Sequence, residues 1–502
     1  MKKSIAKTLI LIPTIALQLL VFSVLFGVLE PYREYILGAV NILAFIFILI
    51  ILPKRMESNY KVSWIIVILL APIFGGVLYM LFGNKRSSKP INKNITNAEE
   101  ALKFRYKNEL NLDPKIDRNY GHFLQIKTLS KSPCFKVQDP IYYSMGEKYF
   151  NAILSELEKA EKFIFIEFYI VEPGKLYEKF IDVLKRKVDE GVDVRFIYDD
   201  FGSYFKFSLK DLRKLKEINV KTLVFNQLSY IHPRLNNRDH RKMVIIDGKI
   251  AFSGGNNLAD EYANYKERFG VWKDIGFSFK GDGVKSYTYM FAAFWNAFSS
   301  NKIPEIYLEL EANCTSPNDG IVASYYDSPF YEDAITNSLY CDILSSAKKY
   351  VWIYTPYLFL PQSLNDALIR AAKRGIDVRI LIPGIPDKKL VYRFSKSYCP
   401  DLMRAGVRIY TYTPGFLHAK ALLTDDVFAA IGTVNLDFRS LYLHYENNSV
   451  FYRSSIVDAL KQDMIHTMSV SDELDLELLK RKNKNILKEI IDSVFRIIAP
   501  LF

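Results

Sequence analysis

The sequence predicts a duplicated α/β domain behind an N-terminal membrane region made of helices. Three observations carry this prediction. Residues 1–90 contain three long apolar runs, the rest of the chain alternates short apolar strands with amphipathic helices, and one pattern of histidine, lysine and aspartate occurs twice. We therefore expect two mixed β-sheets flanked by helices, with one cleft shared by the two halves.

The composition is that of a folded protein with a charged partner. The chain has 502 residues, of which 50% are apolar and 14% aromatic, and its formal net charge is +12. A chain this apolar buries a large core, which excludes intrinsic disorder. The four cysteines lack C-x-x-C spacing, which argues against a disulfide scaffold or a cysteine-based zinc site. The positive charge leaves three partners open: nucleic acid, an anionic membrane or a phosphorylated substrate.

Three uncharged apolar runs, at 8–29, 35–53 and 62–82, form the predicted membrane region. Each is about long enough to cross a hydrocarbon core of roughly 30 Å. The first is too long for the apolar part of a signal peptide and has no A-x-A-like cleavage site, so we interpret it as an anchor. Residues 1–90 are therefore predicted to hold two or three transmembrane segments.

The charges around these runs give conflicting signals about orientation. Short loops rich in Lys and Arg face the cytoplasm. The linker after the second run carries Lys54, Arg55 and Lys61, so three full crossings would place the large domain outside. The basic segment 85–89 directly follows the third run and favours the cytoplasmic side instead. The number of crossings stays open at this level.

From about residue 148, strands alternate with helices, and the same order occurs twice. The expected elements are strand 163–166, helix 176–188 and strand 191–198, and then strand 350–354, helix 364–373 and strand 375–382. The pieces GVDVR and GIDVR lie 184 residues apart. This period is too long for a solenoid, so it predicts two copies of one domain packed together.

The chain divides accordingly into four parts. They are a membrane anchor at 1–90, a first half at 91–315, a second half at 316–475 and an amphipathic C-terminal helix at 476–502. Apolar residues in the last part recur at helical spacing with charges between them. Such a helix either lies on lipid or docks on the surface of the domain, and both interpretations stay open.

One chemical pattern stands at equivalent places in the two halves. Both copies read H-x-K-x4-D-x6-G-[GT]-x-N and lie 178 residues apart. Their polar residues are His240, Lys242, Asp247 and Asn257 in the first copy, and His418, Lys420, Asp425 and Asn435 in the second. Residues two apart on a strand point the same way, so each histidine faces the same side as its lysine.

Two facing copies supply two imidazoles, two ammonium groups and two amides, a set that suits a phosphodiester. One neutral histidine attacks phosphorus, while the other, protonated, gives its proton to the leaving oxygen. The lysines and the asparagine amides stabilise the phosphoryl oxygens. Asp247 and Asp425 complete the motifs, and their spacing indicates turn or hydrogen-bonding residues rather than proton carriers. We expect no metal and no cofactor, because no carboxylate stands at metal-ligand spacing from either histidine.

Each histidine also needs a partner that fixes its tautomer. Asp274 and Glu446 occupy similar places downstream of the two motifs, and we predict that they orient the histidines. A surface carboxylate at the end of a strand is the alternative interpretation for both.

The paired motifs resemble those of the phospholipase D superfamily, and their surroundings resemble bacterial cardiolipin synthases. The matching stretches are SGGNNLADEY (253–262), KERFGVWKD (266–274), TPY (355–357), IPG (382–384), PGFLHAK (414–420) and NLDFRS (435–440). The resemblance covers nearly all of the chain from about residue 58. It implies a duplicated phospholipase D-like fold.

The resemblance also implies a reaction. A phosphatidyl group would pass from one phosphatidylglycerol to another through a phosphohistidine, giving cardiolipin and glycerol. His240 would be the nucleophile, and His418 the acid and later the base. Trapping the intermediate tests this assignment, and a label on His418 would reverse it. The enzyme would sit in the bacterial plasma membrane as a multi-pass protein with its catalytic domain in the cytoplasm. A phospholipase D-type hydrolase and a membrane-tethered nuclease stay as alternatives.

The location of the charge narrows the choice of partner. Residues 1–89 hold ten basic and three acidic residues, whereas the remaining 413 residues hold 57 and 52. Most of the excess flanks the apolar runs, where it meets anionic headgroups. We therefore expect a membrane, phosphatidylglycerol and cardiolipin as partners, and no nucleic acid. The sequence leaves the oligomeric state open.

Overall fold

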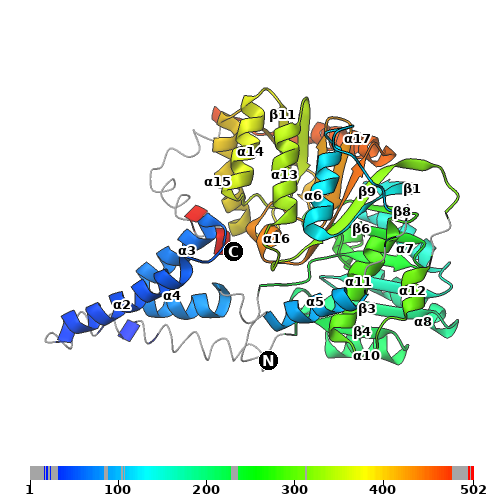
Figure 1. Cartoon of the computed structure of the whole chain (residues 1–502), viewed down its shortest axis with the longest axis horizontal. Coiled ribbons are helices and arrows are strands. Elements are labelled where there is room, and N and C mark those ends of the chain that lie inside the picture. Colours follow the sequence, from blue (N-terminus) through cyan, green and yellow to red (C-terminus); the bar gives the residue numbers. More distant parts are fainter. Residues whose placement is uncertain are drawn as a thin grey trace.

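Two α/β halves stand side by side, and a helical arm projects from one of them (Figure 1). The computed structural model describes residues 32–83, 89–102, 106, 108–227, 236–310, 314–477, 496–497 and 499–501, with residues 16, 19, 20 and 23. The predicted duplicated α/β domain is confirmed. The six strands and helices expected from the repeat all form, with ends that shift by no more than two residues.

The strands of the first half are β1 (Cys134–Tyr143), β2 (Phe163–Phe168), β3 (Asp193–Asp199), β4 (Lys221–Phe225), β5 (Met243–Ile246), β6 (Ile250–Gly254) and β8 (Gly276–Lys280). Its main helices are α7 (Gly146–Leu157), α8 (Lys175–Asp189), α10 (Leu209–Glu217), α11 (Val284–Phe298) and α12 (Glu305–Glu309). Strands β2, β3 and β4 pair in parallel, and β5 pairs antiparallel with β2 and β6.

The second half repeats this plan. Its strands are β9 (Asn318–Asp327), β10 (Tyr350–Tyr354), β11 (Asp377–Pro383), β12 (Arg408–Tyr412), β14 (Ala421–Thr424), β15 (Phe428–Gly432), β16 (Glu446–Tyr452) and β17 (Ser471–Glu473). Its helices are α13 (Ile335–Ser346), α14 (Gln362–Lys373), α15 (Lys389–Arg404), α16 (Phe438–Tyr442) and α17 (Ser455–Ser469). Strands β10, β11 and β12 are parallel, as are their counterparts in the first half.

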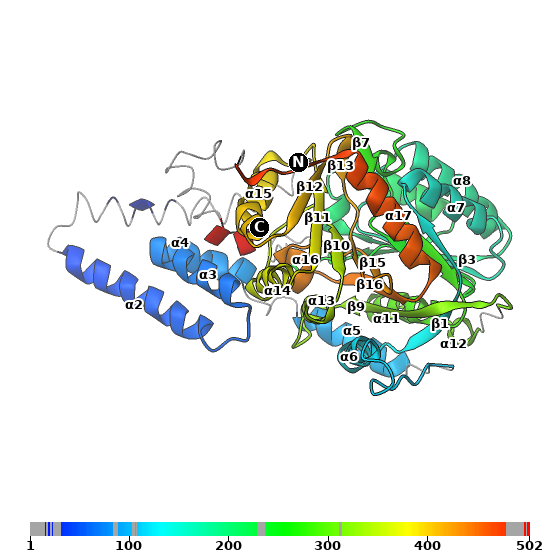
Figure 2. The same cartoon turned by 90° about the horizontal axis from the view of Figure 1, so that it is seen from above.

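The two expected sheets are joined into one sheet of fifteen strands. The order is β17-β12-β11-β10-β14-β15-β16-β9-β1-β8-β6-β5-β2-β3-β4. The junction is the antiparallel pair of β1 and β9, in which Cys134 lies opposite Ala323. This pairing satisfies backbone groups that two separate sheets would leave exposed at their edges. Figure 2 shows the continuous sheet from above, with α17 and α11 packed near the junction.

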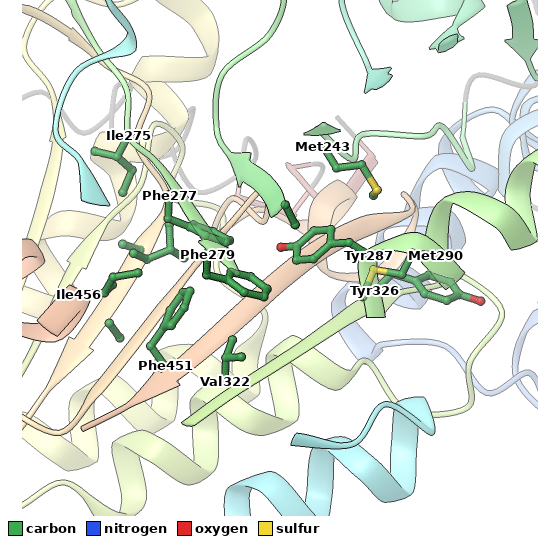
Figure 3. Close-up of a cluster of buried hydrophobic side chains, with 14 of the residues drawn as sticks. Met243, Ile275, Phe277, Phe279, Tyr287, Met290, Val322, Tyr326, Phe451 and Ile456 are labelled. Atoms are coloured by element: carbon green, nitrogen blue, oxygen red, sulfur yellow. The ribbon is translucent and has the colours of Figure 1, made fainter. Parts of the chain in front are cut away.

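The main hydrophobic core also spans both halves. Figure 3 shows side chains from β8, β9, β16, α11 and α17 meeting in one cluster. The rings of Phe277 and Phe451, one from each half, lie 5.1 Å apart at a steep angle. Because both halves bury apolar surface in the same core, we expect them to be held in a fixed relation.

The arm consists of α2 (Arg33–Ile51), α3 (Ser58–Leu70), α4 (Pro72–Leu78) and the short π-helix η2 (Tyr79–Gly83). Helix α2 has 19 residues, is mostly exposed, and among the described residues is the one helix long and apolar enough to cross a membrane. It corresponds to the second predicted run. The first run, 8–29, lies almost entirely outside the described residues.

The third run, 62–82, does not form one straight helix. The helix breaks at Ala71, where φ is −145° and ψ is 76°, because the residue before Pro72 is kept out of the helical region. The segments before and after the break then pack against each other, and the ring centroids of Trp64 and Tyr79 lie 5.4 Å apart. Helix α3 has 13 residues and is therefore about 20 Å long, short of the roughly 30 Å of a hydrocarbon core.

Glycine allows this close fold. A Cβ atom on Gly75 would lie 2.6 Å from the carbonyl oxygen of Val67 in the facing leg. The third run is thus a helical hairpin, which we call the α3–α4 hairpin and define as residues 58–83.

Two further helices and the C-terminus pack on the domain. Helix α5 (Lys89–Leu102) runs along α11, and α6 (Tyr120–Ser130) packs on α13 and β9 of the second half. Most of the predicted C-terminal helix at 476–502 lies outside the described residues. Near its end, Arg496 forms an ion pair of 2.6 Å with Asp401 of α15.

Candidate active site

Both motif histidines line one cavity of about 490 Å³ between the two halves. His240 and Lys242 directly precede β5, and His418 and Lys420 directly precede β14. The histidines are 8% and 6% exposed, so they reach the cavity from a largely buried position. This size lies in the range of small-molecule sites. A larger cavity of about 910 Å³ lies between α5, α11 and α12, and no histidine is among its lining residues.

Each histidine pairs with a carboxylate from the opposite half. Nδ1 of His240 lies 2.8 Å from Oε2 of Glu446. Nδ1 of His418 lies 2.6 Å from Oδ2 of Asp274. The two predicted orienting residues thus both lie at the site, and each contacts the histidine of the other half. Neither half contains a complete pair.

Short parallel strand contacts between the halves place each histidine beside the carboxylate of the other half. The small strand β13 (Gly415–Leu417) pairs in parallel with β7 (Val271–Lys273), so the residues that follow them, His418 and Asp274, lie side by side. An isolated parallel bridge between Asp239 and Tyr445 places His240 beside Glu446 in the same way.

Backbone hydrogen bonds fix the two histidines a second time. The N–H of His240 donates to the carbonyl of Tyr445 at 2.9 Å, and the N–H of His418 donates to the carbonyl of Lys273 at 2.7 Å. Nδ1 of His418 also lies 2.8 Å from Nζ of Lys420. When Nδ1–H donates to the carboxylate, the Nε2 atom of the neutral imidazole carries the lone pair. Each ring is therefore oriented as a nucleophile or base.

Burial sets the charge state of the site. It lowers the pKa of His240 well below the usual value, and the charge of Lys242 adds to this effect. It lowers the pKa of His418 to about 4. The two lysines are buried as well, which lowers the pKa of Lys242 to about 7 and that of Lys420 to about 8. An anionic phosphate entering the cavity favours the charged form of all four groups.

The two carboxylates differ in their own ionisation. Burial raises the pKa of the Asp274 carboxyl, but His418 and Lys420 outweigh it, so the net effect is a lowered pKa. Burial raises the pKa of Glu446 well above the usual value, although Lys242 acts against it. An ionised carboxylate stabilises an imidazolium, so the environment of His418 is the better one for holding a proton.

The predicted phosphate-binding asparagines both line the cavity. Asn257 donates from Nδ2 to the Tyr262 hydroxyl at 2.8 Å, and its Oδ1 accepts the N–H of Ile170 at 3.0 Å. The amide of Asn435 hydrogen-bonds the Asp437 carboxyl. Both amides are therefore partly engaged by the protein.

The motif aspartates lie away from the imidazoles, at the opposite ends of β5 and β14. Asp247 accepts the backbone N–H groups of residues 161–163, with distances of 2.7–2.9 Å. Asp425 accepts those of residues 348–350 at 2.7–3.0 Å. Both have positive φ, 55° and 54°. They tie each turn to the start of the neighbouring strand, which is the hydrogen-bonding role that their spacing indicates.

Several further residues shape the site. The hydroxyl of Thr433 hydrogen-bonds Glu446, and its position is the Thr of the G-[GT]-x-N part of the second motif. Tyr169 packs edge-on against His240, with ring centroids 4.8 Å apart. Tyr262 and Trp272 flank His418 at 5.3 and 5.5 Å. Tyr169 stands at a strand end that matches the position of Tyr357 in the repeat, which makes both candidates for lining the cavity, and both do line it. The spacing of Tyr262 and Trp272 does not distinguish them from core rings.

Metal-binding geometry is not found at the site or elsewhere in the described part of the chain. No three side chains of His, Cys, Asp or Glu among the described residues gather closely enough to hold an ion.

Two protein-family models match this chain, one in the catalytic domain and one in the N-terminal part. The family model described as "Cardiolipin synthase, PLD-like domain" matches residues 153–272 and 340–468. A second model, "Phospholipase_D-nuclease N-terminal", matches residues 39–84. The first therefore covers both motifs, and the second covers α2 from residue 39 onward and the α3–α4 hairpin.

Curated relatives match over nearly the full length. Cardiolipin synthase of Alkalihalophilus pseudofirmus is 33% identical over 495 residues, which cover 96% of this chain and 97% of that protein. Cardiolipin synthase 2 of Bacillus anthracis is 34% identical over 467 residues, 91% of this chain and 90% of that protein. The crystal structure of phosphatidylserine synthase from Haemophilus influenzae aligns with a TM-score of 0.55 at 13% identity, over 75% of this chain and 100% of that one. That likeness supports the fold.

Proposed function

The chain belongs to the family of cardiolipin synthases with phospholipase D-like domains and is a phosphatidyltransferase of that type, and from this premise we propose that it converts two molecules of phosphatidylglycerol into cardiolipin and glycerol. The observation that carries the proposal is the pair of histidines on one cavity, each held by a carboxylate from the other half. This arrangement supplies one nucleophile and one proton carrier.

The first step forms a phosphohistidine. Nε2 of His240 attacks phosphorus, so that a P–N bond forms while the P–O bond to glycerol breaks. His418, protonated at Nε2, gives this proton to the departing glycerol oxygen. Lys242 and Lys420 stabilise the phosphoryl oxygens, each by roughly 3–4 kcal/mol in the transition state. The ionised Asp274 beside His418 supports this division of roles.

The second step transfers the phosphatidyl group. The terminal hydroxyl of a second phosphatidylglycerol gives its proton to His418 and attacks phosphorus. A P–O bond forms, the P–N bond breaks, and His240 is neutral again. His418 has regained its proton and is ready for the next cycle.

Purified full-length protein is expected to convert phosphatidylglycerol vesicles into cardiolipin and glycerol in equal amounts, measured by lipid mass spectrometry and a glycerol assay. Vesicles of phosphatidylcholine alone serve as the control. Phosphatidic acid as the sole lipid product would support the hydrolase instead. Cleavage of DNA without lipid turnover would support the nuclease.

The chain associates with the membrane through its apolar N-terminal part, and we propose a specific topology for it. The run 8–29 and helix α2 cross, while the α3–α4 hairpin enters and leaves on one side. Two crossings then place the basic N-terminus, the linker with Lys54 and Arg55, and the segment 85–89 all on the cytoplasmic side. The conflict between charge signals disappears, because each basic segment obeys the positive-inside rule. The catalytic domain lies in the cytoplasm.

This topology is testable with single cysteines in a background without the four native ones. A membrane-impermeant maleimide added to intact spheroplasts is expected to label Tyr32→Cys but neither Ser58→Cys nor Ser345→Cys. Inverted vesicles are expected to show the reverse. Labelling of Ser58→Cys and Ser345→Cys from opposite sides would mean that the hairpin crosses the bilayer.

A further inference from the structure

The α3–α4 hairpin packs directly on α16 of the catalytic domain. The ring of Tyr60 stacks on that of Phe438, with centroids 4.9 Å apart and planes at 13°. Tyr60, Trp64 and Tyr79 are buried in one apolar cluster with Phe438 and Leu443. Figures 1 and 2 both show α16 between the hairpin and the body of the domain.

Polar contacts close the same junction. Asn236 donates to the carbonyl of Phe82 at 2.7 Å and accepts from Arg439 at 3.3 Å. Arg439 also donates to the carbonyl of Leu501 at 3.4 Å. The hydroxyl of Ser63 donates to the carbonyl of Ile497. The hairpin, the segment before the first motif, α16 and the C-terminus therefore meet at one point.

This junction is part of the wall of the catalytic cavity. Phe438, Arg439, Ser440 and His444 line the same cavity as the two motif histidines. The other side of the hairpin is apolar and open: Val62, Leu69, Leu70 and Met80 are exposed, Leu70 by 74%. Helix α2, which packs on the hairpin, exposes an apolar surface over most of its length. The exposed apolar residues of α2 and of the hairpin thus lie on elements that pack, directly or through one another, against the cavity wall.

We propose that the junction of α3, η2 and α16 is the entrance through which a bilayer phospholipid delivers its phosphodiester to the cavity, while its acyl chains stay in the membrane. This inference rests on the proposed phospholipid substrate. A cavity of about 490 Å³ suits a headgroup and not two acyl chains. Arg439 lines the cavity, and its guanidinium supplies a charged donor for the incoming phosphodiester. The exposed apolar residues of the hairpin contact the chains that remain outside.

An element that only anchored the protein in the membrane would need no contact with the cavity wall, whereas the hairpin packs on that wall. Tyr60 lies outside the cavity lining and acts on it through Phe438 and through its interactions with Asn236 and Arg439. Its replacement therefore changes how lipid enters without touching the reacting groups. Leu209 on α10 is 75% exposed and lies outside both the hairpin and the cavity lining, so it offers a control.

Tyr60→Ala is expected to lower phosphatidyl turnover in phosphatidylglycerol vesicles by about tenfold, because an aromatic pair and its burial are lost. Turnover of monomeric dihexanoyl-phosphatidylglycerol, which needs no passage from a bilayer, is expected to change less than twofold. Leu209→Ala is expected to match the wild type on both substrates. Equal losses on the two substrates would show a structural role, and no loss on vesicles would equally overturn the entrance.

Photo-crosslinking tests the same point in the unmodified protein. Phosphatidylglycerol with a diazirine in its acyl chain is expected to label α3, η2 and α16, as mapped by peptide mass spectrometry. Labels confined to other parts of the catalytic domain would contradict the proposal. Total turnover is counted as cardiolipin plus phosphatidic acid, so a protein that hydrolyses lipid still tests the entrance, and only the proposed synthase function fails.

Discussion

His240→Ala and His418→Ala are each expected to lower cardiolipin synthesis by about 10⁴-fold, because each removes a group that forms or breaks a bond at phosphorus. Loss of the carboxylate-bound ring also leaves Glu446 or Asp274 without its partner. Initial rates on phosphatidylglycerol vesicles measure the effect. His466→Ala, an exposed histidine on α17, is expected to keep the wild-type rate and serves as the control.

A substrate with a good leaving group separates the roles of the two histidines. Phosphatidyl-p-nitrophenol needs no acid for the first step, so His418→Ala is expected to release about one equivalent of p-nitrophenol per enzyme and then stop. The stalled protein should carry a phosphatidyl group on His240. His240→Ala is expected to show no burst. A burst in His240→Ala with the label on His418 would reverse the assignment.

Lys242→Met and Lys420→Met are each expected to lower kcat/KM by about 10²- to 10³-fold, the loss typical of one donor to a developing negative charge. Both side chains are buried beside a histidine and donate to its backbone carbonyl, so a neutral isostere preserves most of the packing. Lys→Arg at the same positions keeps the charge and is the matched comparison. Losses of less than threefold would contradict a role on the phosphoryl oxygens.

The same lysines predict the pH dependence. Each is charged below its pKa, about 7 for Lys242 and about 8 for Lys420, so kcat/KM is expected to fall as the pH rises through 7 and 8. A bound phosphodiester raises both pKa values, so the fall in kcat should come at higher pH than the fall in kcat/KM. Lys→Arg variants should lose the corresponding part of this decline. A decline unchanged in both variants would assign it to another group.

Local sequence patterns were sufficient for the fold class and for the motifs. Strands such as β2 and β10 are short apolar runs, and the apolar pattern that identifies them depends only on the geometry of a single strand. The repeated H-x-K-x4-D pattern places each histidine beside its lysine for the same reason. The spacing also identified Asp247 and Asp425 as turn residues, since the strand between lysine and aspartate keeps the two apart.

Sequence patterns within one segment did not predict features that depend on contact with a second segment. The third apolar run has the length of a crossing helix, and Pro72 marks the break, but only the packing of Trp64 on Tyr79 shows that the legs fold back. The joining of two sheets depends on the edge pairing of β1 with β9. The stacking of Tyr60 on Phe438 joins residues far apart in sequence that share no pattern.

The division between sequence and tertiary structure is sharpest at the histidines. The sequence by itself determined two copies of a histidine–lysine motif and two candidate carboxylates. Only the tertiary structure decided that His240 takes Glu446, 206 residues away, and that His418 takes Asp274, 144 residues away. The physical reason is that short parallel contacts between the halves, β13 with β7 and Asp239 with Tyr445, choose the partner. Such contacts depend on how two finished domains pack, which no periodicity within either domain encodes.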